Sequence, residues 1–171
     1  MFTAGQDYER FMGRWSRMLA ESFVAFARIA QAGRVLDVGS GTGSLARAVL
    51  AAAPKAEVVG IDASPAFVEY AGSHITGRVR FEVCDAQELP FGDGLFDACC
   101  AQLILNFIPD QHKALAEMRR VTKPGGTIAA AVWDHLEGMM MLRIFLFMTD
   151  PSTEVIIAAD HATCTHASCI R

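Results

Sequence analysis

The chain has 171 residues, with 15 Lys and Arg against 19 Asp and Glu, and a net charge of −4. This length is typical of one domain. Apolar residues make up 52% of the chain and charged residues 20%, so there is enough material for a packed core, and general disorder is excluded. The mild acidity argues against a broad phosphate-binding face, and we expect no nucleic-acid partner.

The sequence shows neither a membrane span nor a signal peptide. Its longest apolar stretch, 139–148, is ten residues long and contains Arg143, whereas a span needs about 20 residues. Residues 1–17 contain no apolar core of the kind that signal peptides have. The five cysteines are an odd number and two are adjacent, which is typical of reduced thiols. We therefore expect a cytoplasmic protein with no membrane partner.

Predicted strands and helices alternate along the chain. The apolar spacing predicts an amphipathic helix over 15–29, with Trp15 and Met18 on its apolar face. Ser64 and Asp110 are expected to cap later helices at their N-termini. Short apolar runs predict strands over 34–38, 57–62, 78–83, 96–101 and 127–133. Further helices are predicted over 44–53, over 65–71 and after residue 110, with a turn at 123–126.

This alternation predicts an α/β fold: a three-layer, Rossmann-like, doubly wound and mostly parallel sheet with helices on both faces. The continuous apolar run at 96–101 predicts a central strand, and the alternating run at 78–83 predicts one nearer the edge. Ligands in such sheets bind beyond the carboxyl ends of the strands. We expect the main domain to cover 1–148, with a helical cap at 1–32, and an atypical tail to cover 149–171.

A glycine-rich loop follows the first strand, with the sequence Asp37-Val-Gly-Ser-Gly-Thr-Gly43. Its glycines permit a tight turn and a close approach to a ligand. A dinucleotide-binding loop needs glycine at position 44, where this chain has Ser44, and the Lys of a phosphate-binding Walker loop is absent. The carboxylate of Asp37 would repel a pyrophosphate but attract an ammonium or sulfonium group.

Two more acids follow the next two strands. Asp62 ends the second strand, where it can accept hydrogen bonds from ribose hydroxyls. Asp85 follows the third strand and can accept from an exocyclic amine, while the backbone of Ala86 can serve a ring nitrogen. Together with Asp37, these positions fit a ligand with a cationic amino-acid end, a ribose and an adenine. Simpler roles remain open: a helix cap for Asp62, a turn for Asp85 and a structural role for Asp97.

These motifs resemble those of the class I S-adenosylmethionine-dependent methyltransferases, and more narrowly the small-molecule type that includes the quinone-biosynthesis C-methyltransferases. The matching segments are 35–43, 60–64, 85–91, 96–97 and 123–126. The resemblance implies S-adenosyl-L-methionine as cofactor and a small-molecule methyl acceptor as partner. It places the methionine portion on Asp37 and loop 39–43, the ribose on Asp62, the adenine on Asp85 and Ala86, and the far wall at Gln102. The expected cofactor-binding residues are Asp37, Gly39, Ser40, Gly41, Thr42, Gly43, Asp62, Ala63, Asp85, Ala86 and Gln102.

Two other functions compete with methyl transfer. One is a non-catalytic cofactor-binding domain, and the other is a nicotinamide-dependent oxidoreductase, against which Ser44 and Asp37 both count. The sequence assigns no catalytic base, and its candidates are Asn106, His112, Asp134 and His135.

The segment 8–15 mixes aromatic and basic residues. In the resembling family this region folds over the cofactor and helps to build the acceptor pocket. Aromatic faces there can stack on the adenine or cover the sulfonium. The alternative is that Phe11 and Trp15 pack into the core.

The tail departs from the family pattern, in which two further strands follow the fifth. We expect a helix over 136–148 and a strand over 153–159. An uncovered fifth strand would be a template for pairing, so either 155–159 covers it or the chain self-associates through that edge. The altered tail also predicts cofactor binding with weak or absent turnover. The His and Cys residues at 161–169 do not match a zinc-finger spacing, and we expect no metal.

Overall fold

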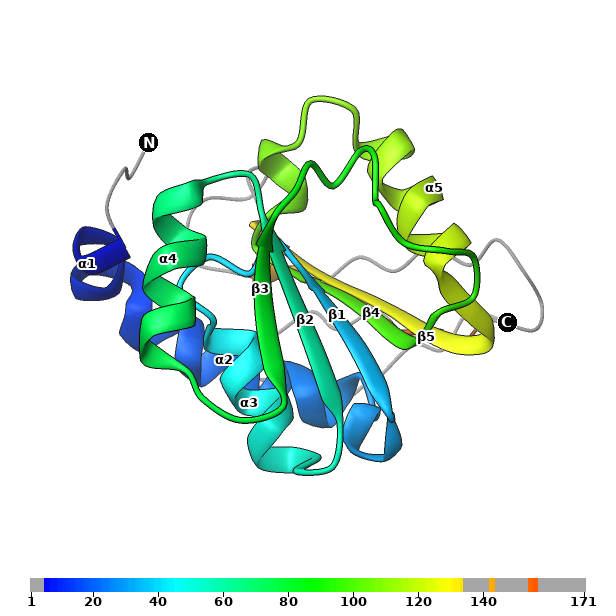
Figure 1. Cartoon of the computed structure of the whole chain (residues 1–171), viewed down its shortest axis with the longest axis horizontal. Coiled ribbons are helices and arrows are strands. Elements are labelled where there is room, and N and C mark those ends of the chain that lie inside the picture. The colour runs from blue at the N-terminus through cyan, green and yellow to red at the C-terminus, as the bar shows by residue number, and fades with distance from the viewer. Residues whose placement is uncertain (1–4, 134–141, 144–153, 157–171) are drawn as a thin grey trace.

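The computed structural model describes residues 5–133, 142–143 and 154–156. In these ranges, strands and helices alternate as the sequence predicts (Figure 1). The helical elements are α1 (Gly5–Tyr8), the π-helical turn η1 (Glu9–Gly13), α2 (Arg14–Phe26), the 3-10 turn η2 (Ile29–Gln31), α3 (Ser44–Ala52), α4 (Pro65–His74), the 3-10 turn η3 (Leu105–Phe107) and α5 (Gln111–Val121). The strands are β1 (Arg34–Val38), β2 (Glu57–Asp62), β3 (Val79–Val83), β4 (Phe96–Gln102), β5 (Thr122–Trp133), β6 (Leu142–Arg143) and β7 (Glu154–Ile156).

The first five strands form a parallel sheet in the order β3-β2-β1-β4-β5. The chain therefore runs outward from β1 to β3, returns to the other side of β1 and continues through β4 to β5. This arrangement confirms the doubly wound α/β fold, with β3 at an edge and β4 inside the sheet. The point where the strand order reverses, between β1 and β4, is where such sheets bind ligands.

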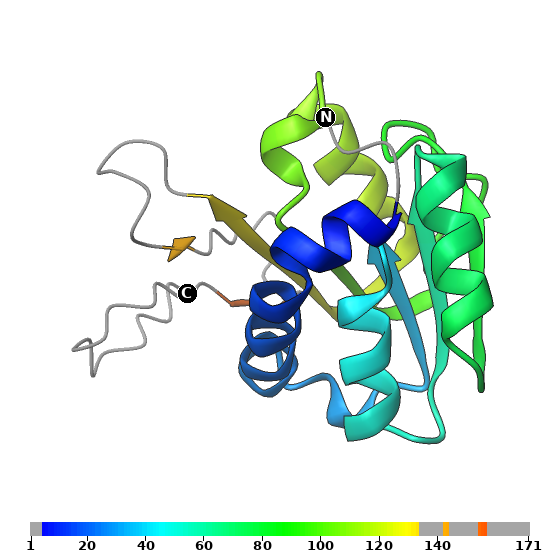
Figure 2. The same ribbon diagram turned by 90° about the vertical axis from the view of Figure 1, so that its left-hand side faces the viewer.

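Helices cover both faces of the sheet, and each face has its own core cluster. On one face, Val35 of β1 and Cys100 of β4 pack with α2 and α3. On the other face, Leu36, Cys99 and Met118 pack together, the last from α5. Figure 2 shows α2, α3 and α4 on the near side of the sheet and α5 behind it. Because successive strand residues point to opposite faces, the adjacent cysteines of β4 belong to different clusters.

The buried face of α2 differs from the one expected. It consists of Ser16, Ala20, Phe23 and Val24. Trp15 and Met18 were expected on this face, but their side chains are 58% and 54% exposed, and that of Phe11 is 69% exposed. The alternative that Phe11 and Trp15 pack into the core is therefore wrong.

Two local predictions near strand and helix ends also need correction. The predicted turn at 123–126 is the irregular start of β5, because the pairing register shifts between Phe96 and Ala98. Ser64 stands at the N-cap position of α4 but makes no side-chain capping bond. Asp110 does cap α5, since its side chain accepts a hydrogen bond from the backbone N–H of Lys113 at 2.9 Å.

The free edge of β5 is covered by both short strands of the tail. β7 pairs with β5 in parallel at 127–129, which confirms the predicted strand and its covering role over 154–156. β6 pairs with β5 in antiparallel fashion at 132–133, so the predicted helix over 136–148 is wrong at 142–143. The remainder of that helix and the His and Cys group at 161–169 lie outside the described residues.

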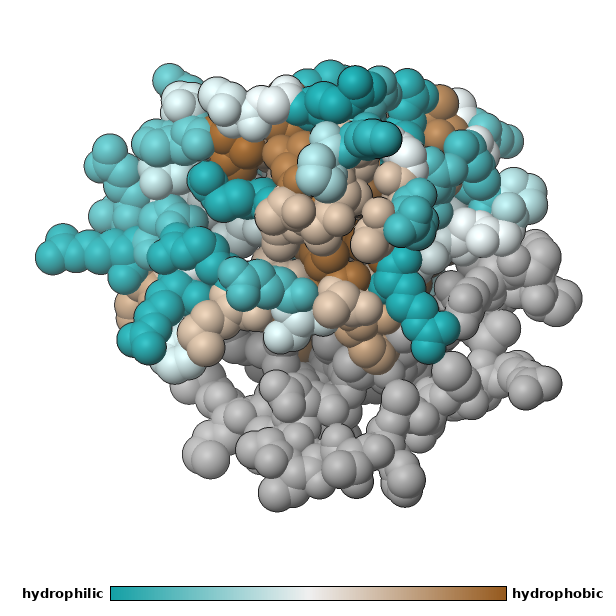
Figure 3. Space-filling view, turned by 90° about the horizontal axis from the view of Figure 1, so that it is seen from below, coloured by the Kyte–Doolittle hydropathy of each residue, from teal (hydrophilic) through white to brown (hydrophobic). Residues whose placement is uncertain are grey.

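Figure 3 shows the end of the sheet at which the five parallel strands begin, opposite the end that carries the glycine loop. Apolar side chains gather in the middle of this face, with hydrophilic side chains above them and on both sides in this view. Asp97 lies near the start of β4 and has a structural role, as expected, because its carboxylate accepts from the backbone N–H groups of Gly33 and Arg34 and pairs with Lys123. Within the described ranges, no helix has both the length and the apolar character to cross a membrane.

Candidate functional site

The glycine loop turns sharply between β1 and α3. Gly39, Gly41 and Gly43 have φ values of 68°, 52° and 85°, a region that favours glycine. A Cβ atom at Gly39 would also overlap the side chain of Ile104, which packs against the loop from beyond β4. All three glycines therefore have a conformational cause, and Gly39 and Gly43 also have a packing cause, since a Cβ at Gly43 would overlap the side chain of Ile75.

Asp62 braces this loop from the end of β2. Its Oδ2 accepts from the backbone N–H of Gly41 and its Oδ1 from that of Ser64, both at 2.9 Å. The backbone N–H of Ser40 donates to the carbonyl of Ile61 at 2.8 Å. Burial raises the pKa of Asp62, although the two backbone hydrogen bonds oppose this shift. A role in capping α4 alone is excluded, because one carboxylate oxygen holds the loop.

Asp37 is the buried carboxylate of the site. It lies on β1 and points toward α3, where its Oδ2 accepts from the backbone N–H of Ala46 at 3.1 Å. Only 1% of the residue is exposed. Burial and, to a smaller extent, the charge of Asp62 raise the pKa of Asp37 to about 7, against the effect of the Ala46 hydrogen bond. A nearby cation would favour the ionised form.

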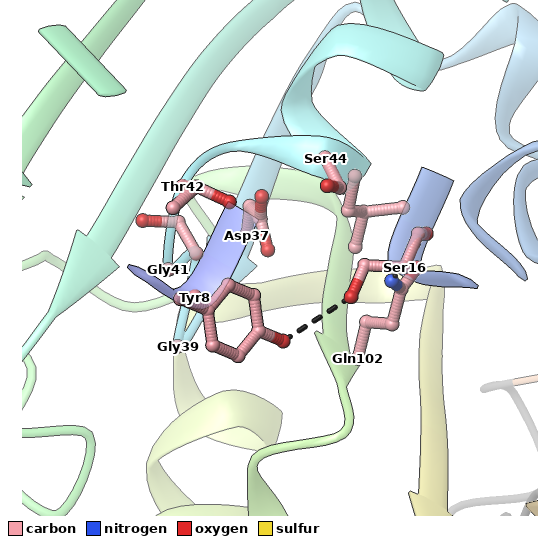
Figure 4. Close-up of a pocket in the computed structure, with 10 residues that line it drawn as sticks. Tyr8, Ser16, Asp37, Gly39, Gly41, Thr42, Ser44 and Gln102 are labelled. Atoms are coloured by element: carbon pink, nitrogen blue, oxygen red, sulfur yellow. Dashed lines mark hydrogen bonds between the residues drawn. The ribbon is translucent and has the colours of Figure 1, made fainter. Parts of the chain in front are cut away.

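A small pocket lies between the glycine loop and the N-terminal helices (Figure 4). Its volume of about 30 Å³ is room for about two water molecules. Figure 4 shows Asp37 and Thr42 on the side of the loop, and Ser16 and Gln102 across from them. The lining residues are Tyr8, Ser16, Asp37, Gly39, Ser40, Gly41, Thr42, Ser44, Leu45 and Gln102.

Two oxygen atoms in this lining are buried without a hydrogen-bond partner, Ser40 Oγ and Gln102 Oε1. The amide group of Gln102 is oriented by its Nε2, which donates to the carbonyl of Ser16 at 2.9 Å. Buried polar atoms in proteins nearly always have partners. Gln102 Oε1 can only accept, so a ligand that completes this pocket offers it an ammonium or another N–H or O–H group, while the Ser40 hydroxyl can accept or donate. The neighbouring Asp37 favours a positive charge.

The segment 8–16 forms one wall of the pocket, and we call it the N-terminal wall. The hydroxyl of Tyr8 and that of Ser16 share a hydrogen bond of 3.2 Å, and the Tyr8 ring packs edge-on against Phe67. Thr42 Oγ1 donates to a carboxylate oxygen of Glu9 at 2.6 Å, which joins the wall to the glycine loop. Burial raises the pKa of Tyr8, the Ser16 hydrogen bond opposes this, and the charges of Glu9 and Asp62 add to it.

The structure brings only part of the predicted cofactor site into this pocket. Asp37, residues 39–42 and Gln102 line it, while Gly43 is the N-cap of α3. Asp62 lies behind the loop, and Ala63, Asp85 and Ala86 are not among the lining residues. The pocket is also lined by Ser16, Ser44 and Leu45, which were not predicted as site residues, although the position of Ser44 directly after the glycine loop was a usable signal.

Asp85 lies in an exposed turn next to the end of β2. Its carboxylate accepts from the backbone and side-chain N–H groups of Gln87. These hydrogen bonds hold the pKa of Asp85 below its usual range. The backbone N–H of Cys84 donates to the carbonyl of Asp62 at 3.0 Å. The carboxylates after β1, β2 and β3 thus follow neighbouring strands, as predicted, but Asp85 is separate from the pocket.

Neither described candidate for a catalytic base lines the pocket. Asn106 lies in η3, and His112 is exposed in the first turn of α5. Asp134 and His135 are outside the described residues. Among the His, Cys, Asp and Glu residues that the structure describes, no group of three is placed to hold a metal ion.

Comparison with known proteins gives consistent matches. A family model described as a methyltransferase domain matches residues 36–130. The ubiquinone/menaquinone biosynthesis C-methyltransferase UbiE of Desulfotalea psychrophila is 39% identical over 127 residues, which cover 74% of this chain and 48% of that protein. The chain spans about half the length of the curated relatives that it matches.

Two solved structures have similar folds. YcgJ of Bacillus subtilis is 29% identical with a TM-score of 0.60, over 67% of this chain and 50% of that one. The [4+2]-cyclase SpnF is 30% identical with a TM-score of 0.63, over 68% of this chain and 44% of that one. Since a cyclase shares the fold, the reaction has to be argued from the site rather than from the fold.

Proposed function

The chain belongs to the methyltransferase-domain family whose model matches residues 36–130, and from this premise we propose that it binds S-adenosyl-L-methionine and methylates a small molecule. The observation that carries the proposal is the convergence of Asp37 with two partnerless acceptors, Ser40 Oγ and Gln102 Oε1, in one buried pocket. An α-ammonium group offers three N–H donors and a positive charge, and the carboxylate and the two acceptors match it.

The rest of the cofactor follows the ends of the neighbouring strands. We assign the ribose to Asp62, whose oxygens keep accepting capacity beyond the two backbone hydrogen bonds. The adenine is assigned to the turn with Ala63, Asp85 and Ala86. A pocket of about 30 Å³ has room for about two water molecules and is too small even for the amino-acid end of the cofactor that we place in it. The N-terminal wall therefore moves outward when the cofactor enters.

Methyl transfer makes few chemical demands on this chain. The bound cofactor supplies a methyl group on positively charged sulfur; the acceptor supplies the electron pair of the new bond and loses a proton. The described residues act by alignment and by exclusion of water, which together give much of the acceleration of such displacements. Ionised Asp37 would anchor the cationic amino-acid end, and the backbone of loop 39–43 would fix its position.

The acceptor proposed here is a small molecule with a ring carbon that accepts the methyl group. The name of the Desulfotalea relative, a C-methyltransferase of ubiquinone and menaquinone biosynthesis, supports this class. The three cysteines described as free thiols, Cys84, Cys99 and Cys100, support a cytoplasmic location, where thiols stay reduced.

Calorimetry tests the proposal on the full chain, with S-adenosylmethionine, S-adenosylhomocysteine and NAD⁺ as separate ligands. We expect the first two to bind and Gln102→Leu to weaken them roughly tenfold or more, since a buried polar partner is lost. Gln31→Leu is the matched control, because Gln31 is exposed in η2, and it should leave binding unchanged.

The outcome also separates the competing functions. Binding of NAD⁺ in place of the adenosyl ligands would overturn the proposal in favour of an oxidoreductase. Binding of S-adenosylmethionine without methylation of any quinol-type or phenolic acceptor would leave the cofactor site intact and favour the non-catalytic domain.

A further inference from the structure

An apolar stripe lies on the outer surface of the N-terminal helices. Phe11, Trp15 and Met18 follow one another at the i, i+4, i+7 spacing of a helix face. Their exposed fractions are 69%, 58% and 54%, and they are three of the five large apolar residues named as exposed in the described chain. The face that α2 buries against the core is a different one.

A basic stripe runs beside the apolar one. Arg10, Arg14 and Arg17 each precede an apolar residue of the stripe by one position, and all three are exposed. The guanidinium of Arg14 lies 5.6 Å from the centre of the Trp15 ring. Arg17 pairs with Glu9 at the other border of the stripe. Residues 10–20 contain three arginines and no acid, in a chain of net charge −4.

We infer that this face, formed by Phe11, Trp15 and Met18 with Arg10, Arg14 and Arg17, docks the protein on an anionic lipid bilayer. Helices that lie in a membrane interface combine a basic edge with Trp and Phe on the apolar side. Guanidinium groups pair with lipid phosphates, and tryptophan and arginine side chains extend into the headgroup region. The inference goes beyond the proposed methyl transfer and does not depend on it.

The size of the stripe disfavours a second copy of this chain as the occupant. Three partly exposed side chains offer on the order of 400 Å² of apolar surface, whereas a stable protein complex buries about 800 Å² on each partner. Repulsion between like-charged arginine stripes would also oppose a symmetric pair. A bilayer has no such area requirement, and its anionic headgroups complement the charge.

Docking at this face brings the pocket to the membrane surface. The same segment supplies Tyr8 and Ser16 to the pocket wall from its inner side. An acceptor dissolved in the bilayer would then reach the pocket without crossing water. This departs from our expectation of no membrane partner, which depended on the absence of a span and did not consider surface binding.

Vesicle sedimentation tests the inference with the full chain and two compositions, phosphatidylcholine alone and phosphatidylcholine with 30% phosphatidylglycerol. We expect binding to the anionic vesicles, a blue shift of tryptophan emission, and loss of binding at high salt. Trp15→Ser with Met18→Ser should reduce partitioning tenfold or more. Arg10→Glu with Arg14→Glu should do the same on anionic vesicles.

Matched controls carry the same changes elsewhere on the surface. Phe107→Ser removes a side chain that is 59% exposed beyond β4, and Arg47→Glu reverses an exposed charge on α3. Both should bind vesicles as the parent chain does, and circular dichroism and melting confirm that each variant is folded. The inference is wrong if the parent chain does not bind anionic vesicles or if the controls lose binding equally. It is also wrong if Trp15→Ser abolishes a dimer seen without lipid.

Discussion

The glycine loop and the N-terminal wall face each other across one pocket, but they are held in place by different means. Backbone geometry fixes the loop: three glycines at positive φ, a backbone bond from Ser40 and the bracing carboxylate of Asp62. The wall is joined to the loop through one side-chain hydrogen bond, from Thr42 to Glu9, and to β4 through Gln102.

This difference makes the glycine loop the rigid floor of the pocket and the N-terminal wall its movable cover. Hydrogen bonds of side chains across a surface contribute about 1 kcal/mol each, whereas the hydrogen-bonded backbone of the loop and the packed strand end resist displacement. On the function proposed above, the cofactor would find its anchoring groups preformed on the loop, and its entry would require only that the wall separate from the loop.

The largest effect is expected from a change in the floor. Gly39→Val places a β-branched residue at φ 68° and against Ile104, and it should lower the free energy of unfolding by roughly 3–5 kcal/mol. Urea unfolding measures this, with Gly92→Ala as the control in open space. A Gly39→Val variant as stable as the control would contradict a rigid floor.

The stability of the fold depends on pH through Asp37, which lies next to the glycine loop. Its folded pKa of about 7 lies above the unfolded value of about 3.9. As the pH rises from 4 to 7, the unfolded chain loses its proton first, so the stability of the fold falls by roughly 2–4 kcal/mol.

Asp37→Asn removes this pH dependence. The variant should be more stable than the parent at pH 8 and bind S-adenosylmethionine at least tenfold more weakly, as urea unfolding at pH 5 and 8 and calorimetry would show. Asp85→Asn is the control, an exposed acid whose pKa is lowered, so its small effect has the opposite sign. A parent chain equally stable at both pH values would contradict the prediction.

The wall should respond to a milder change. Glu9→Ala removes the hydrogen bond from Thr42 and the ion pair with Arg17, which we expect to lower stability by about 1 kcal/mol. Because opening becomes easier, the association rate of the cofactor should rise several-fold in stopped-flow fluorescence. Ser22→Ala, at an exposed position of α2, should change neither quantity. A slower association in Glu9→Ala would show that the wall does not control entry.

The smallest effect concerns the junction behind the wall. Arg28 follows α2 with φ 53°, a conformation that glycine adopts at helix ends without strain. Arg28→Gly should therefore raise the free energy of unfolding by about 0.5–1 kcal/mol. Arg47→Gly, within α3, should lower it by about 1 kcal/mol, and thermal melts would separate the two signs. Destabilisation by Arg28→Gly would contradict the assignment of strain.

Prediction from the sequence succeeded where the cause is local. The bounds of β1 and β2 match the expected strands, and Asp110 caps α5 as its residue type predicts. Failures occur where a distant partner decides. Residues 142–143 form a strand rather than part of a helix because they pair with the end of β5.

The residues of the candidate site also divide into those that the local sequence predicts and those that a distant partner places. The spacing of the glycines and the acid before them identified the loop and Asp37 in advance. The hydrogen bond from Gln87 to Asp85 joins residues two apart in the chain, in keeping with the turn considered for Asp85. Nothing local indicates, however, that the carbonyl of Ser16 orients Gln102. Such choices depend on which side chains the fold brings within hydrogen-bond distance.

The sequence by itself determined the order of strands and helices, the doubly wound sheet and the family, because apolar periodicity and glycine spacing act between near neighbours in the chain. Only the tertiary structure decided which carboxylate is buried in the pocket and which apolar face of α2 points outward. Trp15 and Phe23 share the same helical pattern, yet one is exposed and the other buried. Burial depends on the elements that pack against a side chain, and these come from distant parts of the sequence.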